Sequence, residues 1–147
     1  MLLLGENSNY NIFYNSNITE TPAFELFNEL YKQSINDGHS SKDVFLNLNF
    51  DKVDVVYCCD EVGDVVAGIA FQYRPIFNEG WILFTFTHKN HRGKGLNGML
   101  RPYVENKLIM MGAEKVCSYI HPNNTSSLKA SLKAGSTIEY YKTVKLL

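Results

Sequence analysis

Hydrophobic residues recur at helical spacing in the first third of the chain. The apolar positions that share one helical face are Phe24, Phe27, Leu30, Tyr31 and Ile35. Thr21 is a good N-cap, Pro22 suits the first helical position, and Gly38 is a stop signal. We therefore expect a helix from Pro22 to Gly38, a short strand before it at residues 11–14, and a second short helix within residues 40–48.

The pattern changes to β-rich runs in the middle of the chain. Residues 53–59, 65–73 and 81–87 consist largely of β-branched and aromatic side chains. Turn-forming residues separate these runs at 60–64 and 75–80. Short connections require antiparallel pairing, so the three runs predict an antiparallel meander.

The second half alternates between helix and strand. A polar stretch at residues 88–94 precedes a helix at 96–111, which contains Pro102 and stops at Gly112. A strand at 115–120 follows, then a helix capped by Asn123 or Asn124 that runs to about residue 134, and a last strand at 137–146. This order predicts a single α+β domain over residues 1–147, with helices packed on a mixed, mostly antiparallel sheet.

Composition narrows the classes of function. The net charge of −1 gives the whole protein no electrostatic attraction to nucleic acid. No apolar run has membrane-spanning length, and the three cysteines lack a C-x-x-C spacing. The four histidines show no metal-ligand spacing, so we expect no metal site. These features predict a cytoplasmic protein with no membrane partner.

The polar stretch has the features of an anion site. Gly93 and Gly95 remove the Cβ atoms that would keep a ligand from the backbone, and Lys89, Arg92 and Lys94 add positive charge. The following helix directs its free N–H groups at this loop, which suits a pyrophosphate. A solvated loop is the alternative. The dinucleotide fingerprint G-x-G-x-x-G also matches from Gly93, but the antiparallel strands before it argue against a βαβ unit.

The loop resembles the acyl-CoA signature R/Q-x-x-G-x-G/A of the GNAT superfamily. Arg92 and Gly95 match this signature, whereas Asn97 occupies a position where glycine or alanine is usual. The resemblance extends over much of the chain, through the matched residues Asp60, Gly63, Gly68, Asn124, Ser127, Lys133 and Gly135.

The resemblance implies an N-acetyltransferase that binds acetyl-CoA where two central strands splay apart. Backbone groups of Phe86 and Thr87 would pair with the pantetheine arm and the thioester carbonyl. The pyrophosphate would be held by the amides of Gly93, Lys94, Gly95, Leu96 and Asn97. Asn124 would contact the cofactor near the last helix, and Lys129 and Lys133 would approach the adenosine phosphate or form a solvated helix face.

The catalytic residues are less well defined. Glu79 precedes Arg92 by thirteen residues, an offset similar to that of the base glutamate in the histone-acetyltransferase branch, and a solvated turn carboxylate beside Gly80 is the alternative. Ser131 occupies the position where many members have a tyrosine that protonates the thiolate. The acceptor is then an amine of a small molecule or a protein.

Two further possibilities are compatible with this sequence. The first is a GNAT-fold module that binds acyl-CoA without catalysis and acts as a sensor or interaction protein. The second concerns assembly, because the last strand at residues 137–146 would form a sheet edge. Its charged side chains suit a monomer, and pairing with a second copy would give a homodimer.

Overall fold

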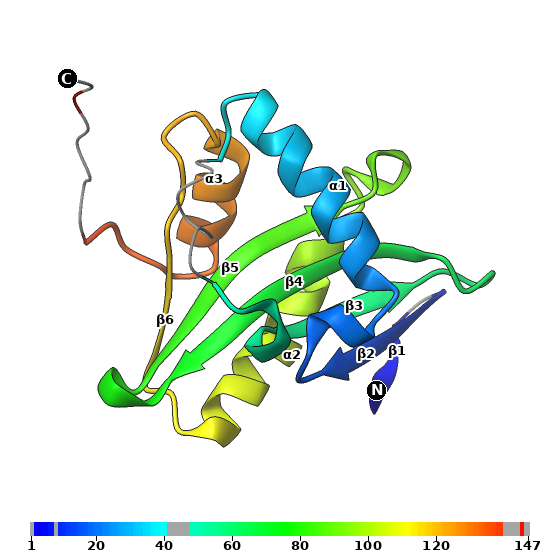
Figure 1. The fold of residues 1–147 in the computed structure, drawn as a ribbon, viewed down its shortest axis with the longest axis horizontal. Helices are drawn as coiled ribbons and strands as arrows, with labels where there is room; N and C mark the ends of the chain where they lie inside the picture. Colours follow the sequence, from blue (N-terminus) through cyan, green and yellow to red (C-terminus); the bar gives the residue numbers. More distant parts are fainter. Residues whose placement is uncertain (1, 8, 41–47, 140–144, 146–147) are drawn as a thin grey trace.

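The computed structural model describes residues 2–7, 9–40, 48–139 and 145, which form a six-stranded sheet in the order β1-β2-β3-β4-β5-β6 (Figure 1). Its strands are β1 (Leu2–Asn7), β2 (Tyr10–Asn15), β3 (Asp54–Cys59), β4 (Val65–Arg74), β5 (Glu79–Thr87) and β6 (Lys115–Ser118). Neighbouring strands are antiparallel up to β5, and β6 runs parallel to β5. The predicted α+β fold with a mixed, mostly antiparallel sheet is confirmed.

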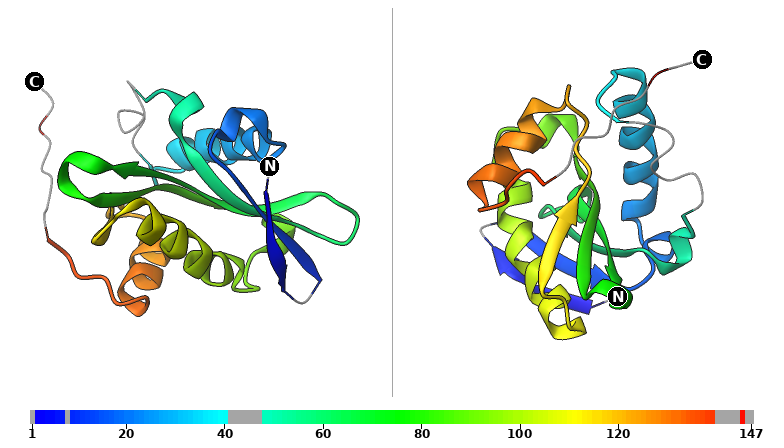
Figure 2. Two further views of the ribbon diagram at one scale, coloured as in Figure 1. Left: turned by 90° about the horizontal axis from the view of Figure 1, so that it is seen from below. Right: turned by 90° about the vertical axis from the view of Figure 1, so that its left-hand side faces the viewer.

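Helices cover both faces of the sheet. α1 (Ala23–Asn36) lies on one face, whereas α2 (Leu96–Met111) and α3 (Thr125–Lys133) lie on the other (Figure 2). Within the described ranges, these elements are joined by the single-turn 3₁₀ helices η1 (Ile18–Glu20), η3 (Phe50–Lys52), η4 (Pro75–Phe77) and η5 (Lys89–His91). No described helix is long and apolar enough to cross a bilayer.

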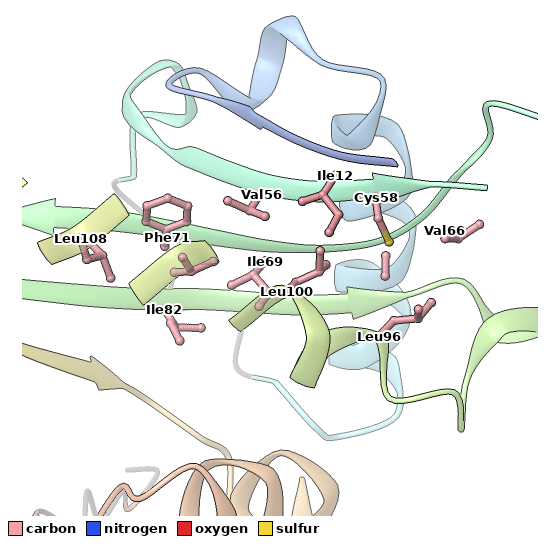
Figure 3. Packing of buried hydrophobic residues seen from close by; sticks show 12 residues of the cluster. Ile12, Val56, Cys58, Val66, Ile69, Phe71, Ile82, Leu96, Leu100 and Leu108 are labelled. Carbon is pink, nitrogen blue, oxygen red and sulfur yellow. The ribbon is translucent and has the colours of Figure 1, made fainter. Parts of the chain in front are cut away.

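Each face of the sheet has its own hydrophobic core. Under α2, Leu100 and Leu108 pack against Val56, Ile69 and Phe71 of the central strands (Figure 3). Under α1, Phe27 is 1% exposed and lies against the rings of Phe84 and Phe86. The apolar residues that predicted the strands therefore divide between two layers.

The turn between β3 and β4 explains two residues of the sequence signature. The Asp60 carboxylate accepts hydrogen bonds from the amides of Val62, Gly63 and Asp64 at 2.9–3.1 Å. Gly63 has φ +99°, a conformation that residues with a side chain rarely adopt. Asp60 and Gly63 thus form the hairpin turn.

Two predicted helix and strand boundaries are wrong. The Thr21 hydroxyl donates to the Ile18 carbonyl at 2.8 Å and does not cap α1. Pro22 occupies the N-cap position, because η1 continues almost directly into α1. At the other end of the chain, the predicted strand is not formed over residues 137–139, and most of its remainder lies outside the described residues. Most of the predicted helix within 40–48 also lies outside them.

Candidate functional site

The connection from β5 to α2 is open on its outer side. Gly93 and Gly95 have φ values of +79° and +71°, and a Cβ atom at either position would meet no other atom within 4 Å. Both residues are exposed. Their backbone can therefore be approached closely by a ligand.

The first turn of α2 presents unpaired amides to this open side. Gly95 is the N-cap and gives no side-chain hydrogen bond, and the first helical bond runs from the Met99 amide to the Gly95 carbonyl at 3.0 Å. Among the described residues, the amides of Leu96, Asn97 and Gly98 have no hydrogen-bond acceptor. Free amides at the positive end of a helix favour an anion.

Two side chains tie this loop to the end of β5. Arg92 Nε donates to the Thr87 carbonyl at 3.2 Å, and Asn97 Nδ2 donates to Thr87 Oγ1 at 3.1 Å. Asn97 Oδ1 is buried without a partner in the described structure. The side chain that departs from the family signature therefore bonds back to β5, an arrangement that the sequence pattern did not predict.

Near this loop, successive residues of β5 direct their backbone N–H and C=O groups to opposite sides of the strand. The His88 amide donates to the Val66 carbonyl in β4 at 2.8 Å. In an antiparallel pair, alternate residues direct their backbone groups toward the partner strand. Phe86 therefore faces β4, whereas Thr85 and Thr87 face the side of β6. Of the two residues predicted to contact the pantetheine arm, Thr87 directs its backbone groups away from β4 and Phe86 does not; Thr85, which the sequence analysis did not name, has the same orientation as Thr87.

A β-bulge divides β5 into two halves. Ala70 lies opposite Phe84 and Phe71 lies opposite Ile82, so Leu83 has no opposite residue in β4. The parallel pairing with β6 also ends at Ile82, opposite Ser118, whereas β5 continues to Thr87. A bulge bends its strand and strengthens its twist. The loop-side half of β5 is thus unpaired toward β6 among the described strands.

Glu79 lies at the far end of β5 from the loop. Its carboxylate accepts a hydrogen bond from Trp81 Nε1 at 2.9 Å and forms an ion pair with Lys115 Nζ at 3.2 Å. The Trp81 hydrogen bond, with Lys115 and the charge of Arg74, lowers the pKa of the Glu79 carboxyl below its usual value. Eight residue steps separate Glu79 from Thr87, or roughly 27 Å of extended chain.

A small surface pocket opens beside Glu79, with a volume of about 40 Å³. The residues that line it are Leu48, Arg74, Trp81, Ile82, Leu83 and Tyr119. The Arg74 guanidinium lies 4.6 Å from the centre of the Trp81 ring, and the Trp81 and Tyr119 ring centres are 4.8 Å apart. The pocket thus combines aromatic surface with a cation.

The remaining predicted site residues belong to α3. The Asn124 side chain accepts from the Ser127 amide at 3.3 Å and caps this helix, as the sequence predicted. Ser131 is half-buried, whereas Lys129 and Lys133 are exposed. The described residues contain no group of His, Cys, Asp or Glu side chains that could hold a metal ion.

Comparison with known proteins gives a family match. The family model described as Acetyltransferase (GNAT) family matches residues 21–135. No curated protein sequence matches the chain significantly.

Solved structures of similar fold include several acetyltransferases. A ribosomal-protein-alanine N-acetyltransferase from Brucella melitensis biovar Abortus 2308 is 14% identical, with a TM-score of 0.66 over 94% of this chain and 99% of that one. An aminoglycoside acetyltransferase from an uncultured soil metagenomic sample, in complex with sisomicin, is 15% identical, with a TM-score of 0.65 over 93% and 97%. AAC(6')-Iy in complex with the bisubstrate analogue CoA-S-monomethyl-acetylneamine is 14% identical, with a TM-score of 0.63 over 94% and 100%. These likenesses concern the fold.

Proposed function

The chain belongs to the acetyltransferase (GNAT) family, and we propose that it transfers an acetyl group from acetyl-CoA to an amine by direct attack in a ternary complex. The observation that supports this most directly is the start of α2. Unpaired amides of Leu96 and Asn97 adjoin the open backbone of Gly93 and Gly95. This arrangement fits a pyrophosphate, because both the hydrogen-bond donors and the helix dipole favour negative charge.

In this proposal, each part of the loop has a separate task. The backbone from Gly93 to Asn97, including Lys94, holds the pyrophosphate, and the Lys94 side chain adds positive charge. Arg92 keeps the loop against β5 through the Thr87 carbonyl. The outward backbone groups of Thr85 and Thr87 would run beside the pantetheine arm, and the splay of β5 from β6 would begin at Leu83. Acetyl-CoA supplies the activated thioester when it is bound.

The amine must lose a proton as it attacks, and Glu79 is our candidate to accept it. The Glu79 carboxylate is charged at neutral pH, but its lowered pKa makes it a weak base. Its distance along β5 from the loop is consistent with a position near the acceptor and away from the phosphates. Ser131 is our candidate donor of a proton to the leaving thiolate, and Asn124 is a candidate cofactor contact.

A second candidate function is an acyl-CoA-binding module without catalysis. The specific observation that favours it is that both Glu79 carboxylate oxygens already have partners, in Trp81 and Lys115. Ser131 also has a weakly acidic hydroxyl.

The class of acceptor is a separate question, and aminoglycosides are one candidate, since a similar structure contains sisomicin.

Two measurements on the full chain test the proposal. Acetyl-CoA at a hundred times its dissociation constant stabilises a native protein by about 2.7 kcal/mol, which corresponds to a rise of roughly 5–10 °C in melting temperature for a domain of this size. Thiol release with a panel of amines then reports transfer. A thermal shift without thiol release from any amine would favour the binding module, and no shift would contradict both candidates.

A further inference from the structure

The pocket beside Glu79 lies on the face of the sheet that α1 covers. Leu48 and Leu83, which line it, also pack against the hydrophobic cluster under α1. Gly80 packs against Leu108 of α2, so the neighbouring Trp81 side chain points to the opposite face. The N-terminal loop of α2 belongs to the other layer (Figure 2). A ligand in this pocket would therefore approach β5 from the side opposite α2.

The wall of the pocket is suited to a flat or apolar group. Tyr119 is 69% exposed although its ring lies 4.8 Å from that of Trp81, with an angle of 37° between the planes. Leu48 and Leu83 add aliphatic surface, whereas the Ile82 side chain belongs to the core under α2. Aromatic pairs of this kind provide a large contact area at little cost in conformational entropy.

The charge in the pocket comes from Arg74. Its Nε donates to Gln72 Oε1 at 3.4 Å, and its guanidinium rests on the Trp81 ring, which holds the side chain in position. Arg74 forms no ion pair with any carboxylate of the described chain. The nearby carboxylate of Glu79 is already bound by Lys115 and Trp81, and exposed Glu139 acts on Lys115. The terminal nitrogens of Arg74 thus form no ion pair within the described chain, although their charge acts on Glu79.

We infer that the acceptor binds across this pocket, which encloses only a part of it, and that the acceptor is an amine that also bears a carboxylate and an apolar or aromatic body. The inference rests on the proposed acetyl transfer. Arg74 would receive the carboxylate in its fork of N–H donors, and the Trp81–Tyr119 pair would receive the apolar body. A polycationic acceptor such as an aminoglycoside would meet the cation of Arg74, while both oxygens of the nearby Glu79 carboxylate are already bound by Lys115 and Trp81, so it is disfavoured by charge.

The sole tryptophan of the chain provides a direct binding assay. Trp81 lines the pocket, so its fluorescence reports occupancy without any acetyl transfer. The probes are 3-phenylpropionate, its neutral amide 3-phenylpropionamide, and sisomicin, each titrated into the full-length protein. We expect the carboxylate to bind about ten-fold more tightly than the amide, as a charge-assisted hydrogen bond predicts, and sisomicin to bind least.

Variants separate the role of Arg74 from general effects of charge. Arg74→Gln should remove the ten-fold preference for the carboxylate, and Arg74→Lys should retain part of it, because the charge remains. Arg101→Gln is the matched control, since Arg101 pairs with Glu105 on α2 and does not line the pocket. This control should keep the full preference. Melting temperatures verify that each variant is folded.

The outcomes distinguish this inference from the proposed function. Equal affinity for the carboxylate and the amide, stronger binding of sisomicin, or an unchanged preference in Arg74→Gln would overturn the inference. None of these results would contradict the proposed acetyl transfer, because acetyl-CoA binding and thiol release are measured separately. Conversely, failure of thiol release with every amine, with the carboxylate preference retained, would contradict acetyl transfer and keep the anion-binding pocket. A higher kcat/KM for L-phenylalanine than for phenethylamine would support both proposals.

Discussion

Gly95 has both a left-handed backbone conformation and an open outer side. Its φ of +71° is costly for any residue with a Cβ atom, and the space around it is empty. We expect Gly95→Asp to abolish CoA binding, because a carboxylate would stand beside the amides proposed to hold the pyrophosphate. Isothermal titration with CoA measures this loss.

Gly63→Asp is the matched control for that variant. Gly63 has φ +99°, and a Cβ atom there would also meet nothing within 4 Å, but this glycine belongs to the turn between β3 and β4. The control should therefore share the backbone strain, about 1–2 kcal/mol, and retain CoA binding. Normal CoA affinity in Gly95→Asp would show that the loop does not cradle the phosphates.

Glu79 provides a second prediction for a single side chain. If its carboxylate accepts the amine proton, Glu79→Gln should lower kcat by about 10²–10⁴-fold with the CoA affinity unchanged. The loss should shrink at high pH, where more of the amine is already neutral. A pH profile of kcat for both proteins checks this, and unchanged turnover at neutral pH would leave Glu79 as only the ion-pair partner of Lys115.

Individual residues were predicted with uneven success, for physical reasons. The exposed glycines and the helix start in the loop follow from local sequence, because backbone conformation there depends on few neighbours. The bond from Asn97 to Thr87 depends on how α2 packs against β5, and no local pattern encodes it. The ion pair of Glu79 with Lys115 likewise requires the parallel register of β5 and β6.

Among the elements, those with strong periodicity were predictable. β3, β4, α2 and α3 agree with their expected positions, because apolar spacing and glycine stops define them. β1 was missed, since Leu2 and Leu3 are 51% and 58% exposed in an edge strand without clear alternation. The bulge at Leu83 was also missed, because a register shift depends on the partner strand.

The contact of β4 with β5 gives a prediction at the scale of elements. A Cβ atom at Gly68 would lie 2.4 Å from Cζ of Phe86, whose ring crosses over the glycine. Gly68→Ala should therefore destabilise the protein by about 1–3 kcal/mol through overpacking. Urea unfolding measures this loss. Adding Phe86→Leu should recover part of the lost stability. If the double variant loses as much stability as the two single variants together, the steric explanation is contradicted.

At the scale of the whole molecule, the stability depends on pH through the carboxylate of Asp54, which lies between the sheet and α2. Burial raises the pKa of Asp54, although a hydrogen bond from the Tyr14 hydroxyl at 2.6 Å and the charge of Lys107 oppose this. A raised pKa in the folded state favours folding at low pH, and that contribution is lost as pH rises through the folded pKa. Asp54→Asn should thus gain stability relative to the wild type between pH 4 and pH 7.

The variant Tyr14→Phe should show the opposite dependence of stability on pH. Tyr14→Phe removes the hydrogen bond that favours the charged carboxylate, so its loss of stability should be larger at pH 7 than at pH 4. Urea unfolding at both pH values measures the free energy of unfolding of each protein. A stability difference that does not change with pH in either variant would show that Asp54 titrates alike in the folded and unfolded chain.

The two faces of the sheet give the whole molecule a division of tasks. The proposed phosphate site belongs to the layer of α2, and the pocket with Arg74 and Trp81 belongs to the layer of α1. The half of β5 between them has no pairing with β6 among the described strands. Under our proposals, cofactor and acceptor would reach β5 from opposite sides and meet near Leu83. Neither the phosphate site nor Arg74 would place a charge between them.

Assembly is the last prediction, and it concerns the open edges of the sheet. β1 and β6 are the outer strands of the described sheet, and β6 is only four residues long. Exposed strand edges favour pairing with another chain unless they are covered or charged. We therefore keep the prediction of a homodimer, in which an open edge of each copy's sheet contributes to the contact. Light scattering across a dilution series should give twice the monomer mass of 16.7 kDa at high concentration. A mass of 16.7 kDa at every concentration would exclude the dimer.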